Sequence, residues 1–141
     1  MALSALPAVG QDTNFGKLAL GADRTSGVLT GSTGGSTSLP AIVSNSDLHS
    51  VKCLGFGDPK PDHLLILQQD FPNLSVRVNS GGSDTTLVIQ GPNGVVRCGD
   101  DMGSNKDASI TDTNWKAGKY KIWVGTSAPG IQRDYTLTVQ P

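Results

Sequence analysis

Charge and aromatic side chains are both scarce in this sequence, and their scarcity argues against several classes of partner. Charged residues make up 16% of the 141 residues, aromatic residues make up 5%, and the formal net charge is -1. This balance provides no electrostatic attraction toward nucleic acid, an anionic membrane surface or a polyanionic substrate. Apolar runs are also short, and none approaches the roughly 18 residues of a membrane-spanning helix. We therefore expect no nucleic-acid partner and no membrane span.

Common catalytic motifs are missing from the sequence as well. It contains no G-x-S-x-G turn, no H-E-x-x-H motif and no Gly-rich loop leading from a strand into a helix. His49 and His63 are the only histidines, and the segment around His63 has the pattern of a Pro-stiffened loop that enters a strand. We predict no catalytic residue. A small secreted hydrolase that depends on His63 is the least favoured alternative.

Turn-forming residues are plentiful, and short alternating runs lie between them. Eighteen Gly and eight Pro leave no long window for an amphipathic helix. Alternation of apolar and polar residues with a period of two indicates β-strands. Nine runs show this pattern: GVLTG at 27–31, SLPAIVS at 38–44, DHLLILQQ at 62–69, LSVRVNS at 74–80, TTLVIQ at 85–90, GVVRC at 94–98, DASITD at 107–112, GKYKIWVG at 118–125 and DYTLTVQ at 134–140.

The length and spacing of these runs predict the fold class. Many short strands separated by turn signals are typical of sandwiches and barrels. We predict an all-β fold, namely a single-domain antiparallel β-sandwich of the jelly-roll or Greek-key type, over residues 17–141. Residues 1–16 are predicted to be a disordered N-terminal segment, and the Gly-Ser-Thr stretch at 31–37 is expected to be poorly ordered.

The two cysteines, Cys53 and Cys98, belong to neither a C-x-x-C motif nor a Cys/His cluster with zinc spacing. Two buried free thiols and one disulfide both remain compatible with the sequence. We predict the disulfide, because each cysteine lies beside a Gly-containing turn at a strand end and no other thiol is available. The bridge would close a loop of about 46 residues, stabilise the fold by roughly 3 to 4 kcal/mol and place the protein in an oxidising compartment.

The densest polar run, VVRCGDDMGSNKDASITD at residues 95–112, raises the question of a metal site. Asp100, Asp101, Asn105 and Asp107 place four oxygen-bearing side chains within this short run. Ca²⁺ prefers six to eight such hard oxygen ligands, so a calcium site is one interpretation. The other is that these side chains cap turns through local backbone hydrogen bonds. Both interpretations stay open at the level of sequence.

Two further positions refine the calcium hypothesis. Lys106 stands where an EF-hand loop requires Gly, and the run lies between strands rather than helices, so an EF-hand is excluded. Asp84 begins a strand that is expected to pair back toward this run. It is the best additional candidate ligand.

The tryptophans suggest a second kind of binding site. Alternation in the run at 118–125 places Tyr120 on one face and Trp123 on the other. If Trp123 were exposed beside Trp115, the two rings would form a stacking platform for a sugar. The alternative is that both rings pack against the core.

From residue 84 onward the sequence contains, in order, a D-x-x-L strand, a paired-aspartate exit, an A-G-x-Y-x-x-x-V strand and a Y-x-L-x-V end. The positions that form these motifs are Asp84, Leu87, Gly94, Asp100, Asp101, Ala117, Gly118, Tyr120, Val124, Tyr135, Leu137 and Val139. This order resembles the bacterial pre-peptidase C-terminal domain, a secreted β-sandwich found beside peptidase and other extracellular domains. The resemblance is best over residues 62–140. Paired cysteines are not general to that family.

Together these patterns predict an exported, non-catalytic module that is secreted or periplasmic. The resemblance implies a binding or stabilising accessory role, and the acidic run adds possible stabilisation by calcium. A carbohydrate-binding module built on Trp115 and Trp123 is the alternative. Whether the partner is a protein or a glycan is not specified by the sequence.

Overall fold

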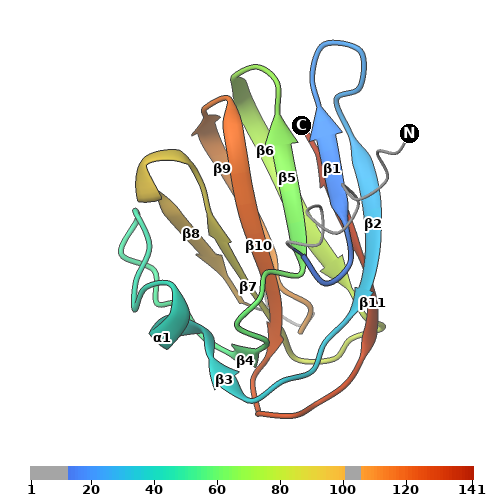
Figure 1. The fold of residues 1–141 in the computed structure, drawn as a ribbon, viewed down its shortest axis with the longest axis vertical. Helices are drawn as coiled ribbons and strands as arrows, with labels where there is room; N and C mark the ends of the chain where they lie inside the picture. Colours follow the sequence, from blue (N-terminus) through green and yellow to red (C-terminus); the bar gives the residue numbers. More distant parts are fainter. Residues whose placement is uncertain (1–12, 101–105) are drawn as a thin grey trace, which may run out of the picture.

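The computed structural model describes residues 13–100 and 106–141, and its main feature is a pair of β-sheets packed face to face (Figure 1). The predicted β-sandwich is therefore confirmed. The strands are β1 Lys17–Leu20, β2 Gly27–Ser32, β3 Thr37–Ser38, β4 Phe56–Gly57, β5 His63–Leu67, β6 Phe71–Asn79, β7 Thr85–Gln90, β8 Val96–Gly99, β9 Ser109–Trp115, β10 Gly118–Thr126 and β11 Asp134–Gln140. Two short helices, α1 Leu39–Ile42 and the 3₁₀ turn η2 Pro92–Gly94, complete the described elements.

The larger sheet runs β1-β5-β10-β7-β8, with β4 and then β3 continuing beside the end of β10, and the smaller sheet runs β2-β11-β6-β9. Strands β1 and β5 pair in parallel, which departs from the predicted antiparallel arrangement, whereas the other described strand pairs are antiparallel. A parallel pair needs a crossover connection. The chain provides one by passing through β2 in the smaller sheet and then through β3, α1 and β4 before it forms β5.

Eight of the nine alternating runs form strands, and the ninth does not. The run at 38–44 contains α1, whose first turn holds Pro40, so the strand prediction for this run is wrong. Proline has no N–H to donate to a sheet but is accepted in the first turn of a helix. The sequence reading also missed β1, β3 and β4, which have only two to four residues each.

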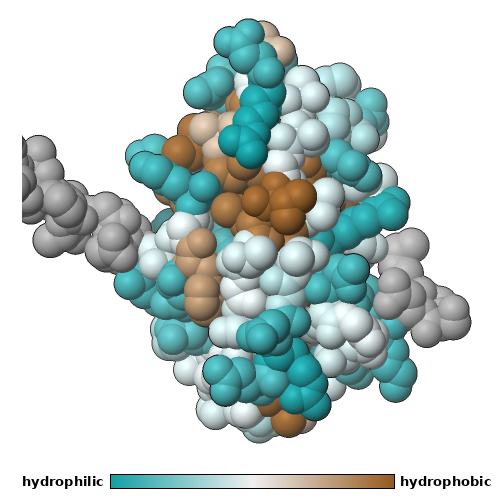
Figure 2. Space-filling model, turned by 90° about the vertical axis from the view of Figure 1, so that its right-hand side faces the viewer, coloured by the Kyte–Doolittle hydropathy of each residue, from teal (hydrophilic) through white to brown (hydrophobic). Residues whose placement is uncertain are grey.

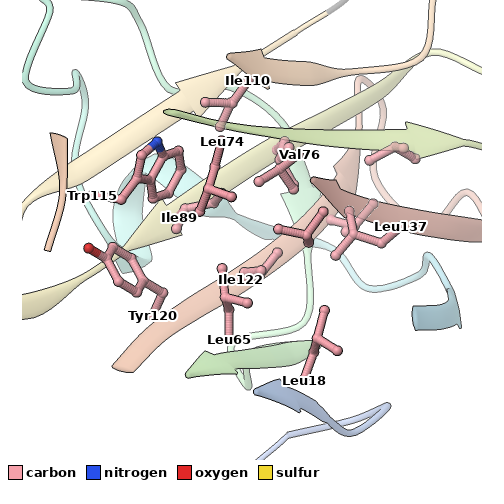
Figure 3. Close-up of a cluster of buried hydrophobic side chains, with 14 of the residues drawn as sticks. Leu18, Leu65, Leu74, Val76, Ile89, Ile110, Trp115, Tyr120, Ile122 and Leu137 are labelled. Atoms are coloured by element: carbon pink, nitrogen blue, oxygen red, sulfur yellow. The ribbon is translucent and has the colours of Figure 1, made fainter. Parts of the chain in front are cut away.

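The space between the sheets is filled by apolar side chains from alternate strand positions (Figure 3). Leu65, Ile89 and Ile122 from the larger sheet face Leu74 and Leu137 from the smaller one. Burial of this kind contributes about 25 cal/mol for each Å² of apolar surface removed from water, so this core supplies the main driving force for folding.

A second apolar cluster covers the outer face of the larger sheet, beneath α1. Its buried members are Leu39, Cys53, Val88, Val96, Cys98 and Trp123. Strand β7 is consequently buried on both faces, and its residues from Thr85 to Ile89 are all inaccessible to solvent. This outer layer is what positions the candidate site described below.

The Gly-Ser-Thr stretch is held more firmly than the sequence suggested. Thr33 is buried, its N–H donates to the Arg133 carbonyl at 2.8 Å, and its hydroxyl accepts from the Arg133 N–H at 2.8 Å. The expectation of poor order at 31–37 is therefore corrected, because β2 and the chain entering β11 brace this connection. Of the predicted N-terminal segment, residues 1–12 lie outside the described part. Asn14 and Phe15 donate backbone hydrogen bonds to the carbonyls of Pro61 and Asp62.

Exposed apolar side chains are few on the described surface. The face on the side of β2 is mostly hydrophilic or neutral around a small hydrophobic patch (Figure 2). The large exposed apolar residues are Phe15, Val28, Leu48, Val51, Leu54 and Ile131. Scattered exposure of this kind is ordinary in proteins. None of the helices described is long and apolar enough to cross a membrane.

Candidate functional site

A pocket of about 370 Å³ opens on the outer face of the larger sheet, where β7 begins and β8 ends. Its polar wall contains Asp84, Thr86 and Asp100. Leu87 pairs with Gly99 in the β7–β8 register, so the next position along brings Thr86 opposite Asp100. Side chains alternate between the faces of a sheet, so Asp84 shares the face of Thr86. Local strand geometry therefore gathers three polar side chains that are separated in the sequence.

The hydroxyl of Thr86 is the most unusual group in this pocket. The residue is 1% exposed, and within residues 13–100 and 106–141 its Oγ1 has no hydrogen-bond partner. A buried polar group without a partner costs free energy, so it is normally satisfied by protein, water or ligand. The Gly55 backbone lies directly against this hydroxyl, because a Cβ at Gly55 would overlap Oγ1. Gly55 also has φ of 106°, a conformation that favours glycine.

A disulfide between Cys53 and Cys98 joins two walls of the pocket and confirms the predicted pairing. The two Cα atoms are 5.2 Å apart. Cys98 stands in β8 just before Asp100, and Cys53 stands just before Gly55. The bridge therefore fixes the segment around Gly55 against the strand that carries Asp100.

Asp107 stabilises a turn on the other face of β7 by accepting hydrogen bonds. Its Oδ1 accepts hydrogen bonds from the hydroxyls of Ser80 and Thr85, and its Oδ2 accepts from the N–H groups of Ser80 and Gly82. Burial alone would raise the pKa of Asp107, but these hydrogen bonds outweigh it and lower the pKa below its ordinary value. For Asp107, the structure thus shows the turn-capping arrangement that was the alternative to calcium ligation.

Of the other four predicted calcium ligands, two lie in the part of the chain that the structure describes and two lie outside it. Asp84 and Asp100 line the pocket, whereas Asp101 and Asn105 lie outside the described residues. Across residues 13–100 and 106–141, no group of three or more His, Cys, Asp or Glu residues is placed to hold a metal ion.

The tryptophan platform that the sequence left as an alternative is not formed, because the rings of Trp115 and Trp123 are both buried. Trp115 is 0% exposed and packs between the sheets 5.6 Å from the ring of Tyr120 (Figure 3). Trp123 is 3% exposed and lies in the outer cluster, where its indole N–H donates to the Pro59 carbonyl at 3.1 Å. Strand alternation gave the face of Trp123 correctly. It did not reveal that a second layer covers that face.

His63 is also buried, which removes the geometric basis for the hydrolase alternative. The residue is 0% exposed, and its Nε2 is 2.8 Å from the hydroxyl oxygen of Tyr135. Burial lowers the pKa of His63 to about 4, an effect that a backbone interaction with Gly16 opposes. An imidazole enclosed in this way has no access to a substrate.

The sequence gave no indication of an ionic cluster at the edge of β8. Asp112 Oδ2 accepts from Arg97 Nε at 2.7 Å and lies 3.0 Å from His49 Nε2. Burial would raise the pKa of Asp112, but hydrogen bonds from Arg97, the Thr113 backbone and His49 lower it. The Arg97 guanidinium also stacks 4.0 Å from the centre of the Trp115 ring. Because His49 and Asp112 are 63 residues apart, no local motif reveals this cluster.

Comparison with known proteins finds a shared fold. No family model matches the sequence, and no curated protein matches it either. Among solved structures, the pre-peptidase C-terminal domain of a collagenase from Bacillus anthracis matches with a TM-score of 0.51 and 16% identity, covering 88% of this chain and 94% of that one. The chain has the fold of a pre-peptidase C-terminal domain. A periplasmic inhibitor of g-type lysozyme from Aeromonas hydrophila matches with a TM-score of 0.48 and 16% identity, covering 88% of this chain and 96% of that one.

Proposed function

We propose that this protein is an exported, non-catalytic β-sandwich module that binds a ligand in the pocket between β7, β8 and the segment around Gly55. The observation that carries the proposal is the buried Thr86 hydroxyl, which has no partner among the described residues and lies beside two carboxylate residues, Asp84 and Asp100. A pocket with a few convergent polar groups is the usual form of a binding site.

Export is supported by the disulfide between Cys53 and Cys98. Disulfides persist in oxidising compartments, which include the periplasm and the extracellular space. The resemblance to pre-peptidase C-terminal domains agrees with a secreted or periplasmic accessory role.

A non-catalytic role is supported by the positions of the two histidines. His63 is buried inside the fold. His49 is hydrogen-bonded to the carboxylate of Asp112, which also accepts a hydrogen bond from Arg97. A general base needs access to the proton that it removes, and His63 has none.

The proposal is tested by titrating the full-length, isotopically labelled chain with a panel of ligands while recording amide NMR spectra. The panel contains a lysine-rich peptide, cellohexaose and CaCl₂. We expect shifts that cluster at Asp84, Thr86 and Asp100, without turnover of peptide or ester substrates. Shifts confined to other surfaces, no shifts with any member of the panel, or measurable hydrolysis would contradict the proposal.

Calcium is a second candidate ligand, favoured by the shared pocket of Asp84 and Asp100. A cation that binds only the folded state stabilises it by RT ln(1 + [L]/Kd), which is about 2.7 kcal/mol at a hundredfold excess over Kd. Thermal melts in EDTA and in millimolar CaCl₂ test this candidate. Equal melting temperatures in the two buffers would exclude calcium as a stabilising ligand.

A further inference from the structure

We propose that the pocket binds a primary ammonium group carried on an alkyl chain. A lysine side chain of a polypeptide and a free diamine share this chemistry. The inference rests on the proposed function, since it names the ligand class of the same pocket.

Charge is the first argument for an ammonium ligand. Asp84 and Asp100 both line the pocket, and the described residues around it include no Lys, Arg or His. Two carboxylates in a concave site favour a cation and disfavour an anion. The protein as a whole carries a formal charge of only -1, so this preference is local to the pocket.

The third hydrogen-bond partner is the Thr86 hydroxyl. An ammonium group has three donors and no acceptor, and a threonine hydroxyl accepts as readily as it donates. Thr86 Oγ1 is buried and has no partner in residues 13–100 and 106–141. Two carboxylates and one hydroxyl therefore match the donors of a single ammonium group, and binding would satisfy the buried oxygen.

The apolar wall of the pocket suits the alkyl stem. Leu54 is 43% exposed, and it lines the pocket together with Phe56 and Pro40. Lysine side chains bury their methylene groups along apolar surface while the charged end seeks polar partners. The apolar part of the wall would add nothing to the binding of Ca²⁺, which prefers six to eight oxygen ligands, so it favours the alkylammonium ligand over the metal ion.

Isothermal titration calorimetry on the full chain tests the proposal with matched probes. The ammonium ligands are N-acetyl-lysine-N-methylamide and 1,5-diaminopentane. N-acetyl-norleucine-N-methylamide provides the same backbone and a similar stem without the charge. We expect saturable binding of an ammonium ligand and at least a tenfold loss of affinity for the norleucine compound. Tighter binding of the lysine compound identifies a polypeptide source, and tighter binding of the diamine identifies a free polyamine; either result supports the ammonium chemistry.

Substitutions in the pocket test whether the ammonium ligand binds there. Asp84→Asn removes one charge and is expected to weaken ammonium binding about tenfold, because hydrogen bonds to charged groups are the stronger kind. Thr86→Val replaces the hydroxyl by a methyl of similar shape and is expected to weaken it about fivefold. Asp23→Asn makes the same charge change at an exposed position in the β1–β2 turn and should leave affinity unchanged. Melting curves of each variant verify that the fold is retained.

Three results would overturn the inference. They are no binding of either ammonium ligand, equal binding of the norleucine compound, and unchanged affinity in Asp84→Asn. If calcium or cellohexaose shifts the pocket signals while ammonium ligands do not, the ligand class is wrong but the pocket remains a binding site. If nothing binds in the pocket, the proposed function fails as well.

Discussion

Thr85 and Thr86 are adjacent, identical and equally buried, yet they lie in opposite surroundings. The Thr85 hydroxyl donates to Asp107 Oδ1 at 3.1 Å and accepts from the Ala108 N–H at 2.9 Å, so it is part of a satisfied turn. The Thr86 hydroxyl points to the other face of β7 and has no partner in the described part of the chain. Buried polar groups that have partners support the fold, whereas one that lacks them marks a place where a ligand could supply the bond.

Removal of the disulfide should have the largest effect on the difference between the two faces of β7, because the disulfide lies only on the face that carries Thr86 and the pocket. Replacing Cys53 and Cys98 together by Ser should lower the free energy of unfolding by about 4 kcal/mol in the chain-entropy account for a loop of this length. Urea denaturation measures the change. Amide hydrogen exchange should accelerate most around Gly55 and β8 and least around the Asp107 turn; uniform acceleration would contradict a local role.

Removal of the Asp107 carboxylate breaks hydrogen bonds on the other face of β7, where Thr85 lies. Asp107→Ala leaves the N–H groups of Ser80 and Gly82 and the Thr85 hydroxyl without their acceptor. We expect a loss of about 3 kcal/mol, since each donor to a charged acceptor contributes roughly 1.5 to 3 kcal/mol and water restores part of it. Chemical denaturation gives the value. A loss below 1 kcal/mol would show that the turn does not depend on this carboxylate.

Asp62 and His63 are neighbouring buried groups whose pKa values burial shifts in opposite directions. Burial raises the pKa of Asp62 to about 6, despite hydrogen bonds from the Val124 N–H and from Asn14. The stability that its neutral form gives is therefore present below pH 4 and lost as pH rises through 6. Burial lowers the pKa of His63 to about 4, so its contribution is present above pH 6.5 and lost as pH falls through 4.

These two pH dependences oppose each other between pH 4 and 6.5. A change in pKa from 3.8 to about 6 for Asp62, or from 6.5 to about 4 for His63, is equivalent to about 3 kcal/mol of stability. Asp62→Asn removes the dependence that opposes the histidine, so this variant should lose about 3 kcal/mol more than the wild type on acidification from pH 6.5 to 4. Denaturation at a series of pH values measures both curves. Parallel curves for the two proteins would contradict the opposing pKa shifts.

Matched substitutions at the adjacent threonines give the smallest and sharpest test. Thr85→Val leaves the Ala108 N–H without an acceptor and should cost about 2 kcal/mol. Thr86→Val removes a hydroxyl that has no partner among the described residues, so stability should stay equal or rise by about 1 kcal/mol. Thermal melts without ligand compare the two. An equal loss in both variants would mean that Thr86 has a structural partner after all.

Features that depend on residues close together in the sequence were predicted more successfully than features that depend on contacts between distant segments. Alternation located eight strands, since the period of two is a property of each strand alone. The disulfide was also predictable, because Cys53 and Cys98 have no other thiol to pair with. The run around Pro40 was not, because its alternation is coincidental and the proline directs the start of a helix.

The candidate site was only partly predictable for the same reason. Asp84 and Asp100 were recognised as partners from the expected hairpin, and they do line one pocket. Thr86 carried no signal, because a threonine within a strand is ordinary. The burial of Trp123 was equally invisible, since alternation assigns it a face without saying what covers that face.

The sequence by itself determined the β-class of the chain and the positions of most strands, and it limited any disulfide to the pair Cys53 and Cys98. It also named the aspartates that border the pocket. These features follow from local alternation, turn chemistry and the count of cysteines. The tertiary structure decided which polar groups are satisfied, placing Asp107 in a hydrogen-bonded turn and Thr86, without a partner among the described residues, in the wall of a pocket. It also buried both tryptophans. The physical reason is that hydrogen-bond satisfaction and burial depend on contacts between segments distant in the chain, and only the packing of the layers fixes those contacts.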